Sequence, residues 1–132
     1  MREVQYLLRD DKDLLSQVQK VFATVSYPSR QEIVLSQTFK DCLDTPGHCA
    51  PADNLGEAET LAIIVCRYTP GETVLFVSDD KDAIALAQKQ EEIRGTFGTS
   101  TLLELLEKTG LISSQESIQI VEKLKKQGRY II

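Results

Sequence analysis

The apolar run TVLFV at residues 73–77, followed at once by the acidic stretch SDDKD, constrains the fold of this chain more than any other feature. A strand that is apolar on both faces is typical of the centre of a parallel sheet, where helices cover each side. Asp79, Asp80 and Asp82 therefore follow the carboxyl end of a predicted central strand. Ligands of open parallel sheets bind at this edge, so these acids are the first candidates for a functional site.

Helical and strand patterns alternate along the rest of the chain. Apolar spacing predicts helices over residues 7–22, 30–43, 56–68, 79–90, 100–110 and 113–128, and short strands over residues 22–27, 73–78, 93–98 and 129–132. Strands that alternate with helices of about 12 residues predict an α/β domain, a three-layer sandwich around a central, mainly parallel sheet. We expect the last of these strands at the edge of the sheet.

Capping signals and apolar faces define several of these helices. Ser29 is a candidate N-cap for one helix and Ser113 or Ser114 for another, while Gly110 and Gly128 are expected to end the last two. The inward face of the helix over residues 30–43 is predicted to carry Ile33, Val34, Phe39, Cys42 and Leu43, and that of the helix over residues 56–68 to carry Leu61, Ile64 and Val65.

Length and composition predict a single globular domain over residues 1–132. Hydrophobic residues make up 42% of the chain and charged residues 27%, which is ordinary for a folded domain. No apolar run approaches the roughly 18 residues of a membrane helix, and the acidic N-terminus does not resemble a signal peptide. Three cysteines without a CxxC motif indicate reduced thiols. We therefore expect a cytoplasmic protein that is not bound to a membrane.

The acids after the apolar strand allow two interpretations. Asp79 or Asp80 is a favoured helix N-cap, and Asp82 in the first turn suits the helix dipole. The same carboxylates are the ligands that a hard cation such as Mg²⁺ or Mn²⁺ prefers, and such an ion activates water for attack on a phosphodiester. From the spacing alone, both interpretations stay open.

Two further acids, Glu57 and Glu59, begin the helix that precedes the central strand. Residues two apart on a helix point about 200° apart, so both cannot face one site. Glu57 shares a face with Ile64, which lies two turns further on. If Ile64 packs against the sheet, Glu57 points toward the strand ends and Glu59 points to solvent.

Four motifs that span residues 54–131 together resemble the C-terminal half of a PIN domain. They are LGEAETLAIIV, VLFVSDDKDAIALA, RGTFGTSTLLELLEKTGLI and KLKKQGRYI, in that order. The chain is most similar to the subgroup with a GEAE helix and a double-Asp strand end. The resemblance implies an α/β fold and, as in many PIN domains including the VapC-like toxins, a ribonuclease that depends on Mg²⁺ or Mn²⁺. It also implies a homodimer and a possible antitoxin-like protein partner.

The resemblance assigns roles to individual acids. Glu57 matches the family's acid on the helix before the fourth strand, and Asp80 matches the acid after that strand, with Asp79 and Asp82 as flanking helpers. Ser78 matches the small hydroxyl residue that precedes these acids. The implied catalytic residues are Glu57, Asp80 and Asp79, and the implied metal ligands are Glu57, Asp80, Asp82 and Asp10.

The N-terminal half departs from the family pattern. The family's first strand ends in an acid, and here that strand is either absent or formed by VQYLL, with Asp10 or Asp11 as the acid. The family's second acid falls near Val34. Glu32 lies two positions away, which is the wrong face of a helix.

Four candidate RNA contacts lie among the acids or follow them in the chain. Lys81 lies among the acids, Thr96 matches the family's Gly-Thr threonine, and Lys126 and Arg129 belong to a small basic cluster near the C-terminus. Basic residues there also suit a helix dipole, and a net charge of −5 disfavours broad, non-specific nucleic-acid binding. The sequence therefore predicts either a metal-dependent ribonuclease-type protein or a PIN-like domain that no longer cuts and serves as a binding or regulatory partner.

Overall fold

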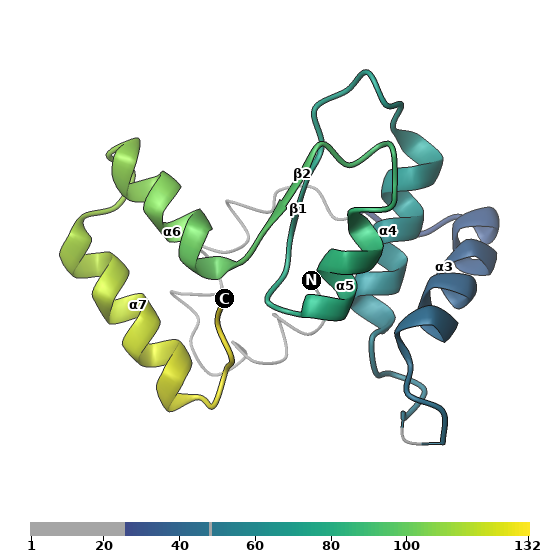
Figure 1. The fold of residues 1–132 in the computed structure, drawn as a ribbon, viewed down its shortest axis with the longest axis horizontal. Coiled ribbons are helices and arrows are strands. Elements are labelled where there is room, and N and C mark those ends of the chain that lie inside the picture. Colours follow the sequence, from purple (N-terminus) through teal and green to yellow (C-terminus); the bar gives the residue numbers. More distant parts are fainter. Residues whose placement is uncertain (1–25, 48) are drawn as a thin grey trace.

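The structure is a computed structural model that describes residues 26–47 and 49–132. The described elements are α3 (Arg30–Leu43), α4 (Leu55–Arg67), β1 (Leu75–Val77), α5 (Lys81–Ala87), β2 (Gly95–Phe97), α6 (Thr99–Lys108) and α7 (Ser114–Lys126). This part of the chain is thus a mixed α/β fold with a two-stranded parallel sheet. In Figure 1, α3, α4 and α5 lie on one side of the two strands, and α6 and α7 lie beyond the other side.

Some of the predictions fall outside the described residues. They are the helix over residues 7–22, most of the strand over residues 22–27, and the candidate metal ligand Asp10. None of the described helices combines the length and the apolar character that crossing a bilayer requires.

The two strands pair in parallel, as the sequence predicts, with Phe76 opposite Thr96 in the register. Phe76 is buried among the helices, but Leu75 and Val77 are 51% and 43% exposed. Successive side chains of a strand point to opposite faces, and in the described part of the chain only the face that carries Phe76 is covered. The prediction that this strand is buried on both faces is therefore wrong for these residues.

The core is built where α4 and α5 pack on the face of β1 that carries Phe76. Ala58 and Ala62 of α4 and Ala83 and Ala87 of α5 are fully buried, and their small side chains let the backbones approach closely. Leu61 is the largest side chain that is wholly buried in the described residues. Close packing at this point fixes the orientation of α4, and hence the direction of its acidic first turn, relative to the end of β1.

Helix α3 has the predicted bounds and the predicted cap. Ser29 and Glu32 form a capping box, in which each side chain accepts a hydrogen bond from the other residue's backbone N–H. The predicted inward face is wrong in three positions, because Ile33 and Val34 are 53% and 68% exposed and Cys42 is exposed. The buried residues are instead Phe39 with Glu32, Ser36 and Lys40.

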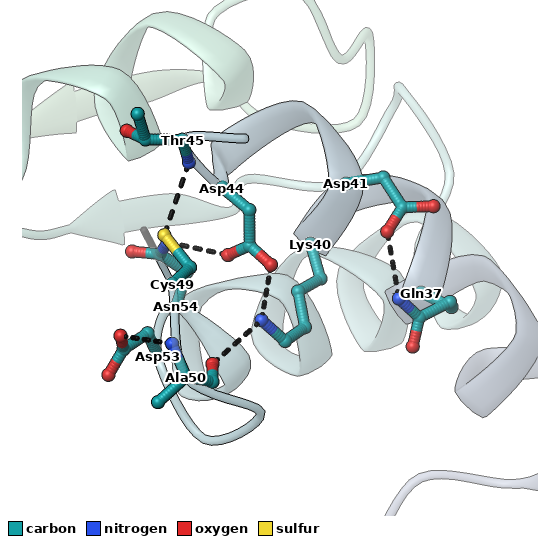
Figure 2. Close-up of polar contacts among 9 residues, drawn as sticks. All are labelled: Gln37, Lys40, Asp41, Asp44, Thr45, Cys49, Ala50, Asp53 and Asn54. Carbon is teal, nitrogen blue, oxygen red and sulfur yellow. Dashed lines mark hydrogen bonds and ion pairs between the residues drawn. The ribbon is translucent and has the colours of Figure 1, made fainter. Parts of the chain in front are cut away.

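The loop between α3 and α4 is closed by polar contacts that set the start of α4 (Figure 2). Lys40 Nζ donates to Asp44 and to the carbonyl of Ala50, and Asn54 Nδ2 donates to the other carboxylate oxygen of Asp44. The hydrogen bond from Lys40, reinforced by that from Asn54, lowers the pKa of the Asp44 carboxyl. Asn54 adopts a left-handed conformation (φ 58°) at the N-cap of α4. Burial of Lys40 on α3 is thus explained by its partners in this loop.

The last two helices end as predicted. Gly110 and Gly128 follow α6 and α7 with φ of 72° and 71°, a conformation that favours glycine. Ser113 caps α7 in a second capping box with Glu116. The hydrogen bonds from the Ser113 backbone and side chain lower the pKa of Glu116.

Residues 129–132 do not form the predicted edge strand. The backbone N–H of Ile132 donates instead to the Asp79 carboxylate, and its carbonyl accepts from Ser100 N–H at 3.0 Å. These partners are a side chain and the start of a helix rather than a neighbouring strand, so no ladder forms. We call residues 129–132 the tail below.

Candidate functional site

An open pocket of about 950 Å³ lies at the carboxyl end of β1. Four segments of the described chain line this pocket. Two come before α6: the first turn of α4 with Glu57, and the junction between β1 and α5 at residues 78–82. The other two are the start of α6 with Thr99, and the end of α7 with part of the tail, at Leu124 and residues 127–131. The fold therefore brings Glu57 into the same pocket as Asp79, Asp80 and Asp82. We call this pocket the acidic cleft.

Asp80 is the N-cap of α5. Its Oδ1 accepts hydrogen bonds from the backbone N–H groups of Asp82 (2.8 Å) and Ala83 (2.9 Å), while its own N–H donates to Ser78 Oγ (3.1 Å). The capping interpretation of these acids is therefore correct for Asp80. It does not exclude a second role, because both hydrogen bonds use one carboxylate oxygen and the side chain is exposed.

Asp79 connects three parts of the chain. It accepts hydrogen bonds from Thr99 N–H and Thr99 Oγ1 at the start of α6 and from Ile132 N–H in the tail. Partial burial opposes ionisation of Asp79, but these three hydrogen bonds outweigh it and lower the pKa of the carboxyl. Because the N-cap of α6 is Gly98, which has no side chain to accept a hydrogen bond, Asp79 supplies the acceptor for this helix start.

The structure also shows which of the two Gly-Thr pairs meets the acids. Thr96, the predicted contact, lies on β2, where Gln88 Nε2 donates to its hydroxyl, and it is not among the residues that line the cleft. Thr99, which sequence reasoning missed, lines the cleft and binds Asp79. The signal was present, because GTFGT repeats Gly-Thr and only the second pair directly precedes a helix.

Glu57 and Glu59 separate as the helix geometry predicts. Both side chains are partly buried, but Glu57 lines the cleft and Glu59 is not among its described lining residues. The prediction that Glu59 points freely to solvent is thus only partly right.

Two of the four candidate RNA contacts lie at the cleft. Lys81 and Arg129 line it, whereas Lys126, in the last turn of α7, and Thr96 do not appear among its described lining residues. The Nζ atom of Lys81 lies 5.8 Å from the centre of the Tyr130 ring, which also lines the cleft and which sequence reasoning missed. Tyr130 lies in the RYII segment, whose composition predicts a strand and gives no sign that the side chain lines a cleft.

Glu32 of α3 forms an ion pair with Arg67, which lies at the end of α4 opposite to Glu57. Arg67 Nε and Nη2 donate to its two carboxylate oxygens at 2.7 and 2.9 Å. The hydrogen bond from Arg67, followed by that from Ser29, lowers the pKa of Glu32 to about 2. The helix rises about 1.5 Å per residue, so Arg67 lies about 15 Å along the axis from Glu57. Glu32 therefore does not join the acidic cleft.

The chemistry of the cleft suits a hard cation, but its carboxylates are not gathered into a preformed cage. In the part of the chain that the structure describes, no three His, Cys, Asp or Glu side chains are close enough to hold one metal ion. Mg²⁺ keeps several waters and often binds through only one or two protein carboxylates together with substrate phosphates. Glu57 and Asp80, with Asp82 beside them, provide donors of that kind.

No family model matches the chain, and comparisons with curated proteins and with solved structures give no match either.

Proposed function

We propose that this chain is a PIN-like, Mg²⁺- or Mn²⁺-dependent ribonuclease-type protein that binds RNA at the acidic cleft. The observation that carries the proposal is that Glu57 lines one pocket with Asp80 and Asp82, at the carboxyl end of a parallel strand. The motif resemblance supports the same placement. We further propose that the complete domain is a three-layer sandwich, of which β1 and β2 form part of the central sheet.

In this proposal Glu57 and Asp80 would hold the ion, and Asp82 would assist. The ion supplies charge neutralisation to a phosphate and lowers the pKa of bound water. The remaining steps belong to the protein: Asp80 keeps its place by capping α5, and Lys81 and Arg129 offer positive charge to the RNA backbone at the rim.

Substitution of Glu57 and Asp80 tests this proposal without removing structural contacts. Asparagine caps helices as well as aspartate does, so Asp80→Asn should keep the fold and lose the charge. We expect Glu57→Gln and Asp80→Asn each to reduce Mn²⁺-dependent cleavage of single-stranded RNA by at least about 100-fold, the scale on which loss of a transition-state charge acts. Gel-resolved cleavage and melting temperature are measured on the same preparations.

Glu59→Gln is the matched control. Glu59 lies on the same helix as Glu57 and is also partly buried, but it is not among the described residues of the cleft. Cleavage by this variant should equal that of the wild type. The proposal of metal-dependent cleavage is wrong if the wild type neither cuts RNA nor gains thermal stability with Mn²⁺.

A second candidate function is a PIN-like domain that binds without cutting and acts as a regulatory partner. The contacts of Asp79 favour it, because a carboxylate that accepts three hydrogen bonds serves the fold rather than a metal. Such a domain would bind RNA or an antitoxin-like protein, and a homodimer is proposed for either function. RNA binding by the wild type with no cleavage in Mg²⁺ or Mn²⁺ would establish this alternative.

A further inference from the structure

Tyr130 exposes a large aromatic side chain at the rim of the acidic cleft. The residue is 65% exposed. It is the one aromatic side chain among the described residues that line the cleft. Exposed aromatic rings at the edge of a polar pocket offer a flat apolar surface to a ligand, so the position calls for a functional explanation.

The tail that carries this ring is anchored through Ile132, which binds Asp79 after β1 and Ser100 at the start of α6. Ile132, two residues further on, donates to Asp79 Oδ1 at 3.0 Å and accepts from Ser100 N–H at 3.0 Å. A Cβ atom on Gly98 would lie 2.2 Å from the Ile132 carbonyl oxygen, so the tail packs directly against the bare glycine. The ring therefore lies two residues from an anchored chain end, which reduces the conformational freedom that a bound ligand must restrict.

Cations accompany the ring. Lys81 Nζ lies 5.8 Å from its centre, and Arg129 is its neighbour in the chain and lines the same cleft. An aromatic face next to positive charge matches a nucleotide, whose base stacks and whose phosphate is anionic. Bases expose their faces only where they are unpaired, so the matching ligand is a single strand rather than a duplex.

We propose that Tyr130 is a stacking platform for one base of a single-stranded RNA, and that Lys81 and Arg129 hold the adjoining phosphates. This inference rests on the proposed function and names the part of the cleft that positions its substrate. Tyr130 does not touch the reacting phosphate and is a positioning residue. In this proposal it holds the strand beside Lys81 and Arg129, so that the phosphate chain passes the carboxylates that line the same cleft.

Binding of a short, labelled oligouridylate tests the platform. Affinity is measured in Mg²⁺ for the full-length wild type and for Tyr130→Leu, with the RNA checked by gel for integrity. Loss of one base–aromatic stack should weaken binding by roughly 5- to 100-fold. Tyr130→Phe, which keeps the ring, should bind within about twofold of the wild type.

A set of oligouridylates, each with one abasic position, separates stacking from general loss of contact. The wild type should bind at least one abasic oligomer more weakly than the intact one, and Tyr130→Leu should lose that difference. Tyr27→Leu is the matched control, because Tyr27 is also 65% exposed and is not among the described residues of the cleft. It should bind like the wild type.

The inference is overturned if Tyr130→Leu binds as tightly as the wild type, or if Tyr130→Phe is as weak as Tyr130→Leu. If Tyr130→Leu binds as tightly as the wild type and the wild type still cuts RNA, the proposed function is retained and only the role of Tyr130 is wrong. A wild type that binds no RNA at all overturns the proposed function, and this inference with it.

Discussion

Arg67 holds Glu32 through two short contacts at the C-terminal end of α4, whereas Glu57 at the N-terminal end of the same helix faces a pocket with three further carboxylates. Glu32 is 3% exposed and matched by a fixed guanidinium. Glu57 lies beside other acids. Lys81 and Arg129 line the same cleft, and neither forms an ion pair with another of the described residues.

The two ends of α4 thus differ in how their carboxylates are neutralised. Glu32 has a cationic partner within the protein, whereas the acids of the cleft are open to a cation from solution. A buried carboxylate is stable only with a partner inside the protein, and Glu32 has one. Carboxylates that share an open pocket repel one another, and water or a bound cation relieves that repulsion. Asp79 is intermediate between these cases, because backbone and hydroxyl donors rather than a cation satisfy it.

Among substitutions at the acidic cleft, we expect Gly98→Ala to lower the free energy of unfolding most. The added Cβ would lie 2.2 Å from Ile132 O, 2.7 Å from Ile132 Cγ1 and 2.8 Å from Asp79 Oδ1, so the tail or the acid must move. Overpacking of this kind costs about 1–3 kcal/mol. We expect a matching loss in the free energy of unfolding, measured by urea denaturation.

Gly56→Ala is the control for this substitution. Gly56 lies in the first turn of α4 with nothing near the position of a Cβ, and alanine has the higher helix propensity. The variant should be as stable as the wild type or more so. Equal stability of Gly98→Ala and the wild type would show that the tail does not pack on Gly98.

We expect Glu32→Gln, which removes the ion pair with Arg67, to lower stability less than Gly98→Ala does, and to do so in a way that depends on pH. The pKa of Glu32 is lowered from 4.5 to about 2 in the folded protein, so the unfolded chain takes up the proton first as the pH falls. The stabilisation from Glu32 is therefore fully present above about pH 4.5 and is lost as the pH falls toward about 2. The gap in melting temperature between the wild type and Glu32→Gln should narrow over that range.

Arg67→Lys sharpens the same test, because lysine cannot make the two parallel N–H contacts that Arg67 makes. It should melt below the wild type near neutral pH, whereas Arg94→Lys, at an exposed arginine, should not. A gap between the wild type and Glu32→Gln that stays constant with pH would contradict the assigned role of Glu32.

Sequence patterns predicted those elements whose signals are local. The N-cap at Ser29, the glycines after α6 and α7, and the parallel arrangement of the strands all agree with the structure. Helical geometry alone separated Glu57 from Glu59. The cap, the glycines and the two acids are each decided by residues within one element or at its ends, and the parallel arrangement follows from the alternation of helices and strands along the chain.

The errors arose where a partner far away in the chain decides the outcome. Apolar periodicity predicted that Ile33 and Val34 lie on the inward face of α3. That face instead carries Glu32, which is buried because Arg67 of α4 binds it. Residues 129–132 have the composition of a strand, yet their partners are Asp79 and the start of α6. No spacing within a single element reports such contacts, so Tyr130 was missed as a member of the cleft, whereas the second Gly-Thr pair of GTFGT was an available signal for Thr99.

We expect the smallest loss of stability from substitutions of Asp80, the N-cap of α5. They test whether the fold depends on the charge of Asp80 or only on its hydrogen bonds. Asp80→Ala removes the acceptor for Asp82 N–H and Ala83 N–H and should cost about 1 kcal/mol. Asp80→Asn keeps an acceptor and should cost almost nothing, whereas Glu32→Gln at the other end of the comparison should be destabilising, because there the charge itself is bound. Urea unfolding near neutral pH measures all three variants. Equal losses for Asp80→Asn and Asp80→Ala would mean that the fold already uses the charge of Asp80, which would leave less of that charge for a cation.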